Sequence, residues 1–392
     1  MELLQPVIQP FAWGSRQGIA ELQGRAVPSA GPEAELWMGA HPSAPSGAAG
    51  TTLDAVIAAD PGHELGAACV ARFGPRLPFL LKVLSAEVAL SIQVHPSRAQ
   101  AQAGFRAGSP NYTDDWPKPE LLCALTPFEV LAGLRPPPDA AALLRDLAVP
   151  ELAPLATELA AATSPQALAG ALAAILTWPG PEELVSTVVD RCARLASSAS
   201  PYAAPCAAVV REARNHPGDR GLVAMLLMRH VVLAPGQAVF LPAGGLHSYL
   251  HGTGIEVLAN SDNVVRAGLT GKHVDVPELL RLLDPAVAVP VLTPAPLGDG
   301  VAWFDTPAPE FRLYVAGLAD VAVPMPARGP RIALCTAGLV TLRVDSGETL
   351  RLARGQSCFV PAADGPLHAA GPARLFLAAP GKTALVPDAA PG

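Results

Sequence analysis

Hydrophobic and polar residues alternate along the first third of the chain in the way typical of β-strands. The clearest stretch reads LSIQVHP (residues 90–96), in which apolar residues alternate with Ser91, Gln93 and His95. Because successive side chains of a strand point to opposite faces, these three polar side chains share one face. A polar face within an otherwise apolar region predicts contact with water or with a binding site.

The pattern changes to helical spacing in the middle of the chain. Residues 139–215 are rich in Ala and Leu, and the segments TSPQ, WPGPEE and SSASPYAAP interrupt them with Ser, Thr or Pro where helices begin. This predicts a bundle of short helices inserted into β structure. Strand patterns return after the bundle, a further helix is predicted over residues 275–284, and short strands separated by Gly, Pro and Asp turns follow from about residue 290.

A repeated segment links the two β regions. LAPGQAVFLPAGGLHSYL (residues 233–250) and LARGQSCFVPAADGPLHAAG (residues 352–371) share L-A-x-G-Q, a Phe, Pro-Ala and a downstream Leu-His. We interpret each copy as a β-hairpin, with a strand, a tight Gly turn and a strand that ends at Pro. Such turns are common in β proteins, but the matched Phe and Pro-Ala favour a true repeat. Two copies predict two small antiparallel barrels.

The predicted fold class is therefore mainly β with an α-helical insertion: two jelly-roll barrels plus a helical domain. With 392 residues the chain exceeds one ordinary core. We expect residues 1–136 and 219–288 to form the first barrel, residues 137–218 the helical insertion, and residues 289–392 the second β domain.

Composition argues against several classes of protein. No apolar run is long enough to cross a bilayer, and the N-terminus lacks the basic flank of a signal peptide. The six cysteines are scattered without a C-x-x-C pair, which argues against a disulfide framework and for a reducing cytoplasm. A net charge of −7 without a basic block argues against nucleic-acid binding. We expect a cytoplasmic protein with no membrane partner.

Lysine is unusually rare, because only four of the 27 basic residues are lysines: Lys82, Lys118, Lys272 and Lys382. Chance is sufficient to explain the presence of any single lysine. A lysine retained in such a chain is also expected where a compact ammonium is needed.

Four residues form a candidate metal site. Gln93 and His95 share a strand face, Glu120 enters an apolar run, and His247 follows a Gly-Gly turn. A buried carboxylate needs a cation or a metal, and imidazole with carboxylate suits Zn²⁺ best, other divalent ions being alternatives. The other interpretation is that each His is a hydrogen-bonded structural residue, which is the commoner role of a lone His.

Several blocks in order resemble one family, the type I mannose-6-phosphate isomerases of the cupin superfamily. They are PFAWGS, ELWMGAHPSAPS, LPFLLKVLSAEVALSIQVHP, KPELLCALTPFEVLAGLRP and GIEVLANSDNVVRAGLTGKHVDV. The stretch SDNVVRAGLT is very specific to the family, and the helical insertion and C-terminal β region match its layout less specifically. The resemblance implies two cupin-type barrels, the first of them catalytic and the C-terminal one without a metal site.

The resemblance also implies an activity: zinc-dependent interconversion of mannose 6-phosphate and fructose 6-phosphate through an enediolate, with one zinc ion per chain. We expect a monomer, although the sequence does not fix the oligomeric state. Gln93, His95, Glu120 and His247 match the family's zinc ligands. Arg266 matches its catalytic arginine. The positions that line its substrate pocket are matched by Ser91, Lys82, Lys118 and Lys272.

The base that would move the proton is predicted from the residues. Glu256 lies in the apolar strand GIEVLA, where burial would raise its pKa toward neutrality. The alternative is a structural carboxylate paired with Lys or Arg. Lys272 and Ser91 are the expected phosphate contacts.

The sequence departs from the family pattern at three places. Pro117 stands where the family commonly has His before K-P-E, GGLH replaces N-E-P-H, and Gly271 replaces the Pro before Lys272. Two other functions are alternatives. A non-catalytic sugar-binding cupin would not need the whole residue set, and a metal oxygenase usually carries a close H-x-H pair. The second repeat copy ends at His368 without Q-x-H or K-P-E, so we expect no metal there.

Overall fold

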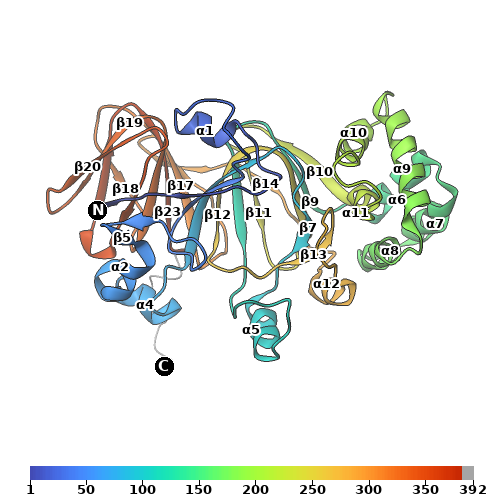
Figure 1. The fold of residues 1–392 in the computed structure, drawn as a ribbon, viewed down its shortest axis with the longest axis horizontal. Helices are drawn as coiled ribbons and strands as arrows, with labels where there is room; N and C mark the ends of the chain where they lie inside the picture. Colours follow the sequence, from blue (N-terminus) through green and yellow to red (C-terminus); the bar gives the residue numbers. More distant parts are fainter. Residues whose placement is uncertain (382–392) are drawn as a thin grey trace.

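The computed structural model describes residues 1–381. Figure 1 shows three parts in a row: a C-terminal β part that holds the N-terminus, a central β part, and a group of helices at the far end. This arrangement confirms a mainly β fold with an inserted helical segment. The expected second β domain runs to residue 392, and its last residues, 382–392, lie outside the described part.

The central β part is an eleven-stranded sheet that folds into two layers. Its strands are β2 (Val7–Gln9), β3 (Glu35–Met38), β6 (Phe79–Ala86), β7 (Ile92–Val94), β8 (Glu120–Ala124), β9 (Phe128–Leu134), β10 (Met228–Leu233), β11 (Ala238–Leu241), β12 (His247–Ala259), β13 (Val265–Gly268) and β14 (Val291–Leu292). Strand β12 pairs with β7 and β9 in its first half and with β6 and β8 in its second. Between the halves Gly252 has φ 127°, and a Cβ there would lie 2.7 Å from the Pro127 carbonyl oxygen. Gly252 therefore lets one strand pass between the layers.

The C-terminal β part is a ten-stranded sheet. Its strands are β1 (Glu2–Leu3), β15 (Ala295–Gly298), β16 (Val301–Trp303), β17 (Arg312–Leu318), β18 (Val323–Met325), β19 (Arg331–Val344), β20 (Thr349–Ala353), β21 (Ser357–Val360), β22 (Leu367–Ala370) and β23 (Ala373–Ala379). Each sheet takes one edge strand from the part of the chain next to the other sheet: β1 pairs with β21 of the C-terminal sheet, and β14 pairs with β11 of the central sheet. Leu36 and Ile255 of the central sheet share one hydrophobic core with Leu313 and Phe359 of the other. The two β parts therefore pack as one body.

The repeated segments are not hairpins, and that prediction is wrong. Strand β10 pairs with β9 and β11 pairs with β8 and β14, whereas β20 pairs with β19 and β21 pairs with β19 and β1. In both copies the strands before and after the turn do not pair with each other. The turn signal in the sequence specifies a reversal but not which strands become neighbours.

The two turns nevertheless share one structure. The side-chain Oε1 of Gln237 accepts a hydrogen bond from the Ala234 backbone N–H at 2.8 Å, and Gln356 Oε1 accepts one from Ala353 at 2.8 Å. The glycine before each Gln has a φ in the left-handed region, 89° and 83°. The repeat L-A-x-G-Q therefore encodes the same side-chain-capped turn twice.

The helical segment extends from Pro137 to Leu227, past the expected end at residue 218. Its α-helices are α6 (Pro137–Leu147), α7 (Ala153–Ala161), α8 (Gln166–Leu176), α9 (Pro181–Ala196), α10 (Ala203–Glu212) and α11 (Gly221–Ala224). In α9 the buried residues Leu184, Val188 and Cys192 recur every four positions on one face. They join a core that reaches Leu131 and Val265 of the central sheet, which fixes the helices against β9 and β13.

Smaller elements cover the remaining surfaces. They are α1 (Gly18–Leu22), α2 (Leu53–Ala59), α3 (Pro61–Leu65), α4 (Ala67–Phe73), α5 (Arg98–Arg106), α12 (Val276–Leu282), and the strands β4 (Gly47–Ala48) and β5 (Thr51–Thr52). The predicted helix at residues 275–284 is confirmed as α12, where Asp275 accepts the Glu278 N–H at 3.0 Å. Among the helices of residues 1–381, none has the length and apolarity to cross a membrane.

Candidate metal centre and substrate pocket

A cavity of about 800 Å³ opens on the central sheet beside the helical segment. Strands β3, β6, β7, β8, β12 and β13 contribute to its wall. Most of the predicted site residues line it, namely Lys82, Ser91, Gln93, Lys118, Glu120, Glu256, Arg266 and Lys272. The two remaining predicted residues, His95 and His247, are almost fully buried and contact Glu120 at the bottom of the cavity.

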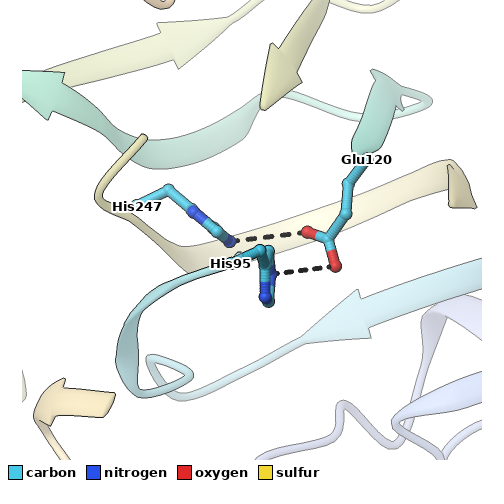
Figure 2. A group of neighbouring side chains, drawn as sticks. All are labelled: His95, Glu120 and His247. Carbon is cyan, nitrogen blue, oxygen red and sulfur yellow. Dashed lines mark ion pairs between the residues drawn. The ribbon is translucent and has the colours of Figure 1, made fainter. Parts of the chain in front are cut away.

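Three predicted metal ligands converge from separate strands. His95 follows β7, Glu120 begins β8 and His247 begins β12. Figure 2 shows both imidazoles directed at the carboxylate: His95 Nε2 lies 3.2 Å from Glu120 Oε1, and His247 Nε2 lies 3.4 Å from Glu120 Oε2. All three ligand atoms lie within 4.8 Å of one another. Residues up to 152 positions apart therefore form one compact site.

The far side of each ring fixes which nitrogen faces the site. His95 Nδ1 lies 2.9 Å from the backbone oxygen of Asn263, and His247 Nδ1 lies 3.0 Å from that of Gly245. Because a carbonyl only accepts, each Nδ1 carries the hydrogen and each Nε2 presents a lone pair to Glu120. Burial lowers the pKa of His95 to about 4, despite the opposing charge of Glu120, so this ring is neutral at neutral pH.

This donor set fits a divalent metal ion. His95 Nε2 and Glu120 Oε2 are both buried without a hydrogen-bond partner among the described residues, and a metal ion between them would satisfy both atoms. Burial opposes ionisation of Glu120, but the positive charge of Lys118, 3.6 Å away, helps to hold the pKa of this carboxyl well below its usual range. Two imidazoles and one carboxylate are ligands that zinc takes.

Gln93 lies beside this group. It pairs with both His247 and Arg266 across neighbouring strands, and its Nε2 lies 3.3 Å from His247 Nε2. The two ends of a Gln amide exchange on a half-turn about the last side-chain bond. Such a turn directs Oε1 at the imidazoles, as a fourth ligand requires.

Glu256 is both paired and open to the cavity. Its Oε2 lies 3.5 Å from Lys82 Nζ, its partner across the β6–β12 ladder, and Lys82 also lies 3.3 Å from Glu35 Oε2. Burial raises the pKa of Glu256 to about 7, as does the charge of Glu120, although Lys82 lowers it. Its carboxyl is therefore poised to change protonation near neutral pH.

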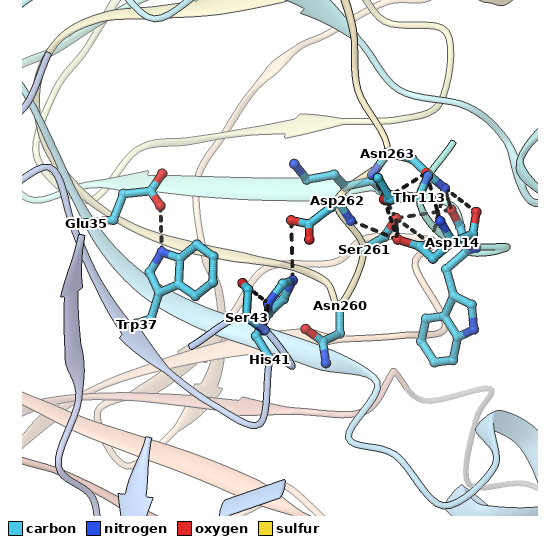
Figure 3. Close-up of polar contacts among 12 residues, drawn as sticks. Glu35, Trp37, His41, Ser43, Thr113, Asp114, Asn260, Ser261, Asp262 and Asn263 are labelled. Atoms are coloured by element: carbon cyan, nitrogen blue, oxygen red, sulfur yellow. Dashed lines mark hydrogen bonds and ion pairs between the residues drawn. The ribbon is translucent and has the colours of Figure 1, made fainter. Parts of the chain in front are cut away.

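Sequence reasoning missed Glu35. This residue is 6 % exposed, contacts Lys82, and accepts a hydrogen bond from Trp37 Nε1 at 2.5 Å, as Figure 3 shows. The signal was available, because Glu35 enters the apolar strand ELWM just as Glu256 enters GIEVLA. Glu35 and Trp37 together hold Lys82, whose ammonium lies 4.9 Å from the indole ring centre.

Arg266 and Lys272 bring positive charge to the cavity without a protein counter-ion. Arg266 lies on β13 and is half-buried, and burial lowers its pKa. Lys272 is exposed at the rim and Ser91 lies just before β7. Within residues 1–381, the side chains of these three residues form no hydrogen bond or ion pair with the protein. They are free to bind an anion.

The comparisons with known proteins agree with this geometry. A family model described as "Phosphomannose isomerase type I, catalytic domain" matches residues 1–137. The chain is 37 % identical over 393 residues to a mannose-6-phosphate isomerase of Salmonella typhimurium, covering 96 % of this chain and 98 % of that protein. It is 33 % identical over 406 residues to one of Rattus norvegicus, covering 92 % and 93 %.

The chain belongs to the type I phosphomannose isomerases.

Solved structures of this family have the same fold. A crystal structure of a variant of phosphomannose isomerase from Salmonella typhimurium has a TM-score of 0.88 at 35 % identity and covers 97 % of this chain and 99 % of that one. A mannose 6-phosphate isomerase described as bound with zinc and yttrium has a TM-score of 0.86 at 36 % identity, with the same coverage.

The family stretch SDNVVRAGLT has a structural explanation at the metal centre. Asn263 supplies the backbone oxygen that fixes His95, and its side-chain nitrogen donates to the backbone oxygens of Asp114 and Trp116, both at 2.8 Å. Ser261 Oγ donates to Asp114 Oδ1 at 2.8 Å. Figure 3 shows this network, which holds the segment that orients His95, a predicted metal ligand.

A second polar group was also missed by sequence reasoning. Ser43 Oγ lies 2.8 Å from His41 Nδ1, and His41 Nε2 lies 3.4 Å from Asp262 Oδ1 (Figure 3). His41 lowers the pKa of Asp262, whose carboxylate lines the cavity. The 221 positions that separate His41 from Asp262 explain why no local pattern predicts their contact.

Two other positions bear on the predicted site. Pro117 is buried beside Trp116, and its ring supplies neither a titratable group nor an N–H where the family commonly has His. His368 lies on β22 in the C-terminal sheet, whereas the one group of three metal-ligating side chains in the described residues is that of His95, Glu120 and His247.

Proposed function

We propose that this protein is a zinc-dependent aldose–ketose isomerase that interconverts D-mannose 6-phosphate and D-fructose 6-phosphate through an enediolate. Family membership supports the substrate pair. The observation that carries the proposal is that the group of His95, Glu120 and His247 opens into a cavity that also presents Glu256 and Arg266. One wall thus combines a metal site, a carboxyl with a pKa near neutrality and an unpaired guanidinium.

Gln93, His95, Glu120 and His247 would hold one zinc ion. When bound, zinc supplies a Lewis acid that orients the sugar oxygens and stabilises negative charge on them. The carbonyl oxygens of Asn263 and Gly245 keep both imidazoles in the tautomer that can ligate, and Lys118, 3.6 Å from Glu120, favours the ionised carboxylate.

Glu256 would move the proton between the two carbons. After the ring opens, the carboxylate removes the hydrogen on C2 of the aldose, next to the carbonyl, and the electron pair forms the enediolate. The same carboxyl returns that proton to C1, while the hydroxyl proton on O2 transfers to O1, which gives the ketose. A base with a pKa of about 7 suits this exchange, because it can accept and release a proton at neutral pH.

Arg266 would stabilise the charge that develops on the oxygens. Its half-buried guanidinium has no protein counter-ion among the described residues, and a partly buried cation acts more strongly than one in bulk solvent. Lys82, fixed between Glu35 and Glu256, would keep the base in place. Lys272 and Ser91 would bind the phosphate.

We also propose the finer organisation of the chain. The two layers of the central sheet would be a cupin-type jelly roll built from residues 1–136 and 219–288, with the helical domain at residues 137–218 and a second cupin-like domain without a metal site from residue 289. Two strands cross these boundaries, because β1 pairs with β21 of the C-terminal sheet and β14 pairs with β11 of the central sheet. We further propose a cytoplasmic monomer.

A coupled assay for fructose 6-phosphate formed from mannose 6-phosphate tests the proposal, with and without a chelator. We expect turnover that disappears on metal removal and returns with zinc. Turnover that survives complete metal removal would refute the metal-dependent mechanism, and turnover of other aldose phosphates but not of mannose 6-phosphate would refute the substrate.

A further inference from the structure

The helical segment contributes its own wall to the cavity. Asn215 and His216, in the connection between α10 and α11, line the same cavity as Ser91 and Lys272. His216 is half-buried, and its Nε2 is buried without a hydrogen-bond partner among residues 1–381. A buried ring nitrogen without a partner is costly unless a ligand satisfies it.

Two carboxylates fix this connection at its ends. The backbone N–H of Ala89, two residues before Ser91, donates to the fully buried Glu212 at 3.1 Å. The backbone N–H of Thr270 donates to Asp219 Oδ2 at 3.0 Å, and that of Gly221 donates to Asp219 Oδ1 at 2.6 Å. The connection therefore spans from the segment that carries Ser91 to the loop that carries Lys272.

Close backbone contact reinforces the second attachment. A Cβ added to Gly221 would lie 2.6 Å from the Leu269 backbone nitrogen, and one added to Gly268 would lie 2.6 Å from Gly221 Cα. The Thr270 hydroxyl then accepts the N–H of Lys272 at 3.1 Å. The position of the Lys272 loop is thus set by the helical segment through Asp219.

The groups gathered around this connection suit a phosphate monoester. Lys272 is a cation and Ser91 is a hydroxyl, and neither is engaged by a described side chain. A dianionic phosphate accepts several hydrogen bonds at once, and bonds from charged donors are the strongest. Imidazole with its hydrogen on Nε2 is a further donor of the right kind.

We propose that His216 binds the phosphate group of the substrate and that Asp219 is the positioning residue for this subsite. The inference rests on the proposed function for its ligand, a sugar 6-phosphate. It gives the helical segment a direct part in recognition, because the substrate would be held between the sheet and the helices.

The test uses the zinc-loaded full chain with His216→Ala, His216→Gln and the matched control His251→Ala, which removes an exposed histidine that does not line the cavity. Calorimetric titration measures Kd for mannose 6-phosphate and for inorganic phosphate, and the coupled assay measures KM and kcat. For His216→Ala we expect Kd and KM to rise about tenfold with kcat and zinc content unchanged, which is the typical effect of one lost hydrogen bond to a charged group. His216→Gln, which keeps a side-chain N–H, should recover most of the loss.

Asp219→Ala should raise Kd in the same direction, and the double variant with His216→Ala should lose less than the sum of the two. A Kd for mannose 6-phosphate within twofold of wild type in both His216 variants would overturn the proposal. Because the Kd for inorganic phosphate does not depend on turnover, a protein that binds phosphate and mannose 6-phosphate through His216 but does not isomerise the sugar would refute the proposed function and leave this inference standing. An active enzyme whose Kd and KM do not change in the His216 variants would refute this inference and leave the proposed function standing.

Discussion

Lys82 offers the sharpest test of the electrostatics at this site. Lys82 and its partners Glu35 and Glu256 are 6 %, 6 % and 2 % exposed, so water hardly screens the ammonium from carboxylates 3.3 and 3.5 Å away. Lys82→Met keeps much of the apolar stem and removes the charge. It would leave two buried carboxylates without a cation. Breaking a buried ion pair in this way costs about 3–5 kcal/mol of unfolding free energy.

The pH dependence distinguishes this explanation from a packing defect. Burial already raises the pKa of Glu256 to about 7, above that of the unfolded chain, and the loss of Lys82 would raise it further. The extra penalty from Glu256 in the variant would therefore be small while Glu256 is protonated in the folded wild-type protein, and it would grow as pH rises through about 7 toward the higher pKa of the variant.

Urea unfolding from pH 5 to 8, followed by tryptophan fluorescence, measures this difference, with Lys272→Met as the control at an exposed lysine. We expect the control to change stability by less than about 0.5 kcal/mol. A loss below about 1 kcal/mol in Lys82→Met, or a loss that does not vary with pH, would refute the reasoning.

Three further predictions follow from the site and its surroundings. His95→Ala should lose zinc and turnover together, as measured by metal analysis and the coupled assay. Arg266→Ala and Glu256→Gln should keep zinc but lower kcat about 100-fold or more, and wild-type turnover in either would remove that residue from the mechanism. Glu129 forms ion pairs with His230 at 2.5 Å and with Arg211 at 2.8 Å. Burial opposes ionisation of this carboxyl, but these partners lower its pKa. Its contribution to stability is therefore present above the unfolded pKa and lost as pH falls, so Glu129→Gln should flatten the acid side of the stability profile.

Local periodicity predicted part of the site, because the strand LSIQVHP fixes the face of Gln93 and His95 from adjacent residues alone. Contacts between residues that are far apart in the sequence could not be predicted in the same way. The contact of Asp262 with His41 and that of Asp219 with Thr270 join distant segments, and they depend on how the layers and helices pack.

The end of the helical segment was missed for a related reason. The stretch GLVAMLL (residues 221–227) is continuously apolar, and such a run does not distinguish a strand from a helix. Its residues are buried in the core shared by helices and sheet. Tertiary packing on every side, rather than an amphipathic pattern, determines that this stretch is helical.

The repeat offers a physical reason why only its first copy would hold the proposed metal site. The turn glycine Gly236 donates its N–H to the Ala124 carbonyl at 2.8 Å, and Gly355 donates to the Cys335 carbonyl at 2.8 Å, so Ala124 and Cys335 are equivalent positions. Four residues earlier in each strand stand Glu120 and Arg331.

Strand register agrees with this equivalence. Glu120 pairs with Leu241, the residue before Pro-Ala in the first copy, and Arg331 pairs with Val360, which holds that place in the second. The carboxylate proposed as a metal ligand is therefore replaced by a guanidinium at the matching position of the second sheet.

That guanidinium is bound by the loop that would otherwise carry the site. Arg331 is 1 % exposed and donates to the carbonyl oxygens of Pro361 at 2.8 Å and Gly365 at 2.6 Å. Burial lowers its pKa to about 10, which still leaves it charged at neutral pH. A cation fixed at this position would repel a metal ion. It also occupies the carbonyl oxygens of its loop, whereas in the first copy the Gly245 carbonyl oxygen accepts a hydrogen bond from His247 and orients that ring. This substitution supports the proposal that only the first copy binds zinc, and it gives the physical reason.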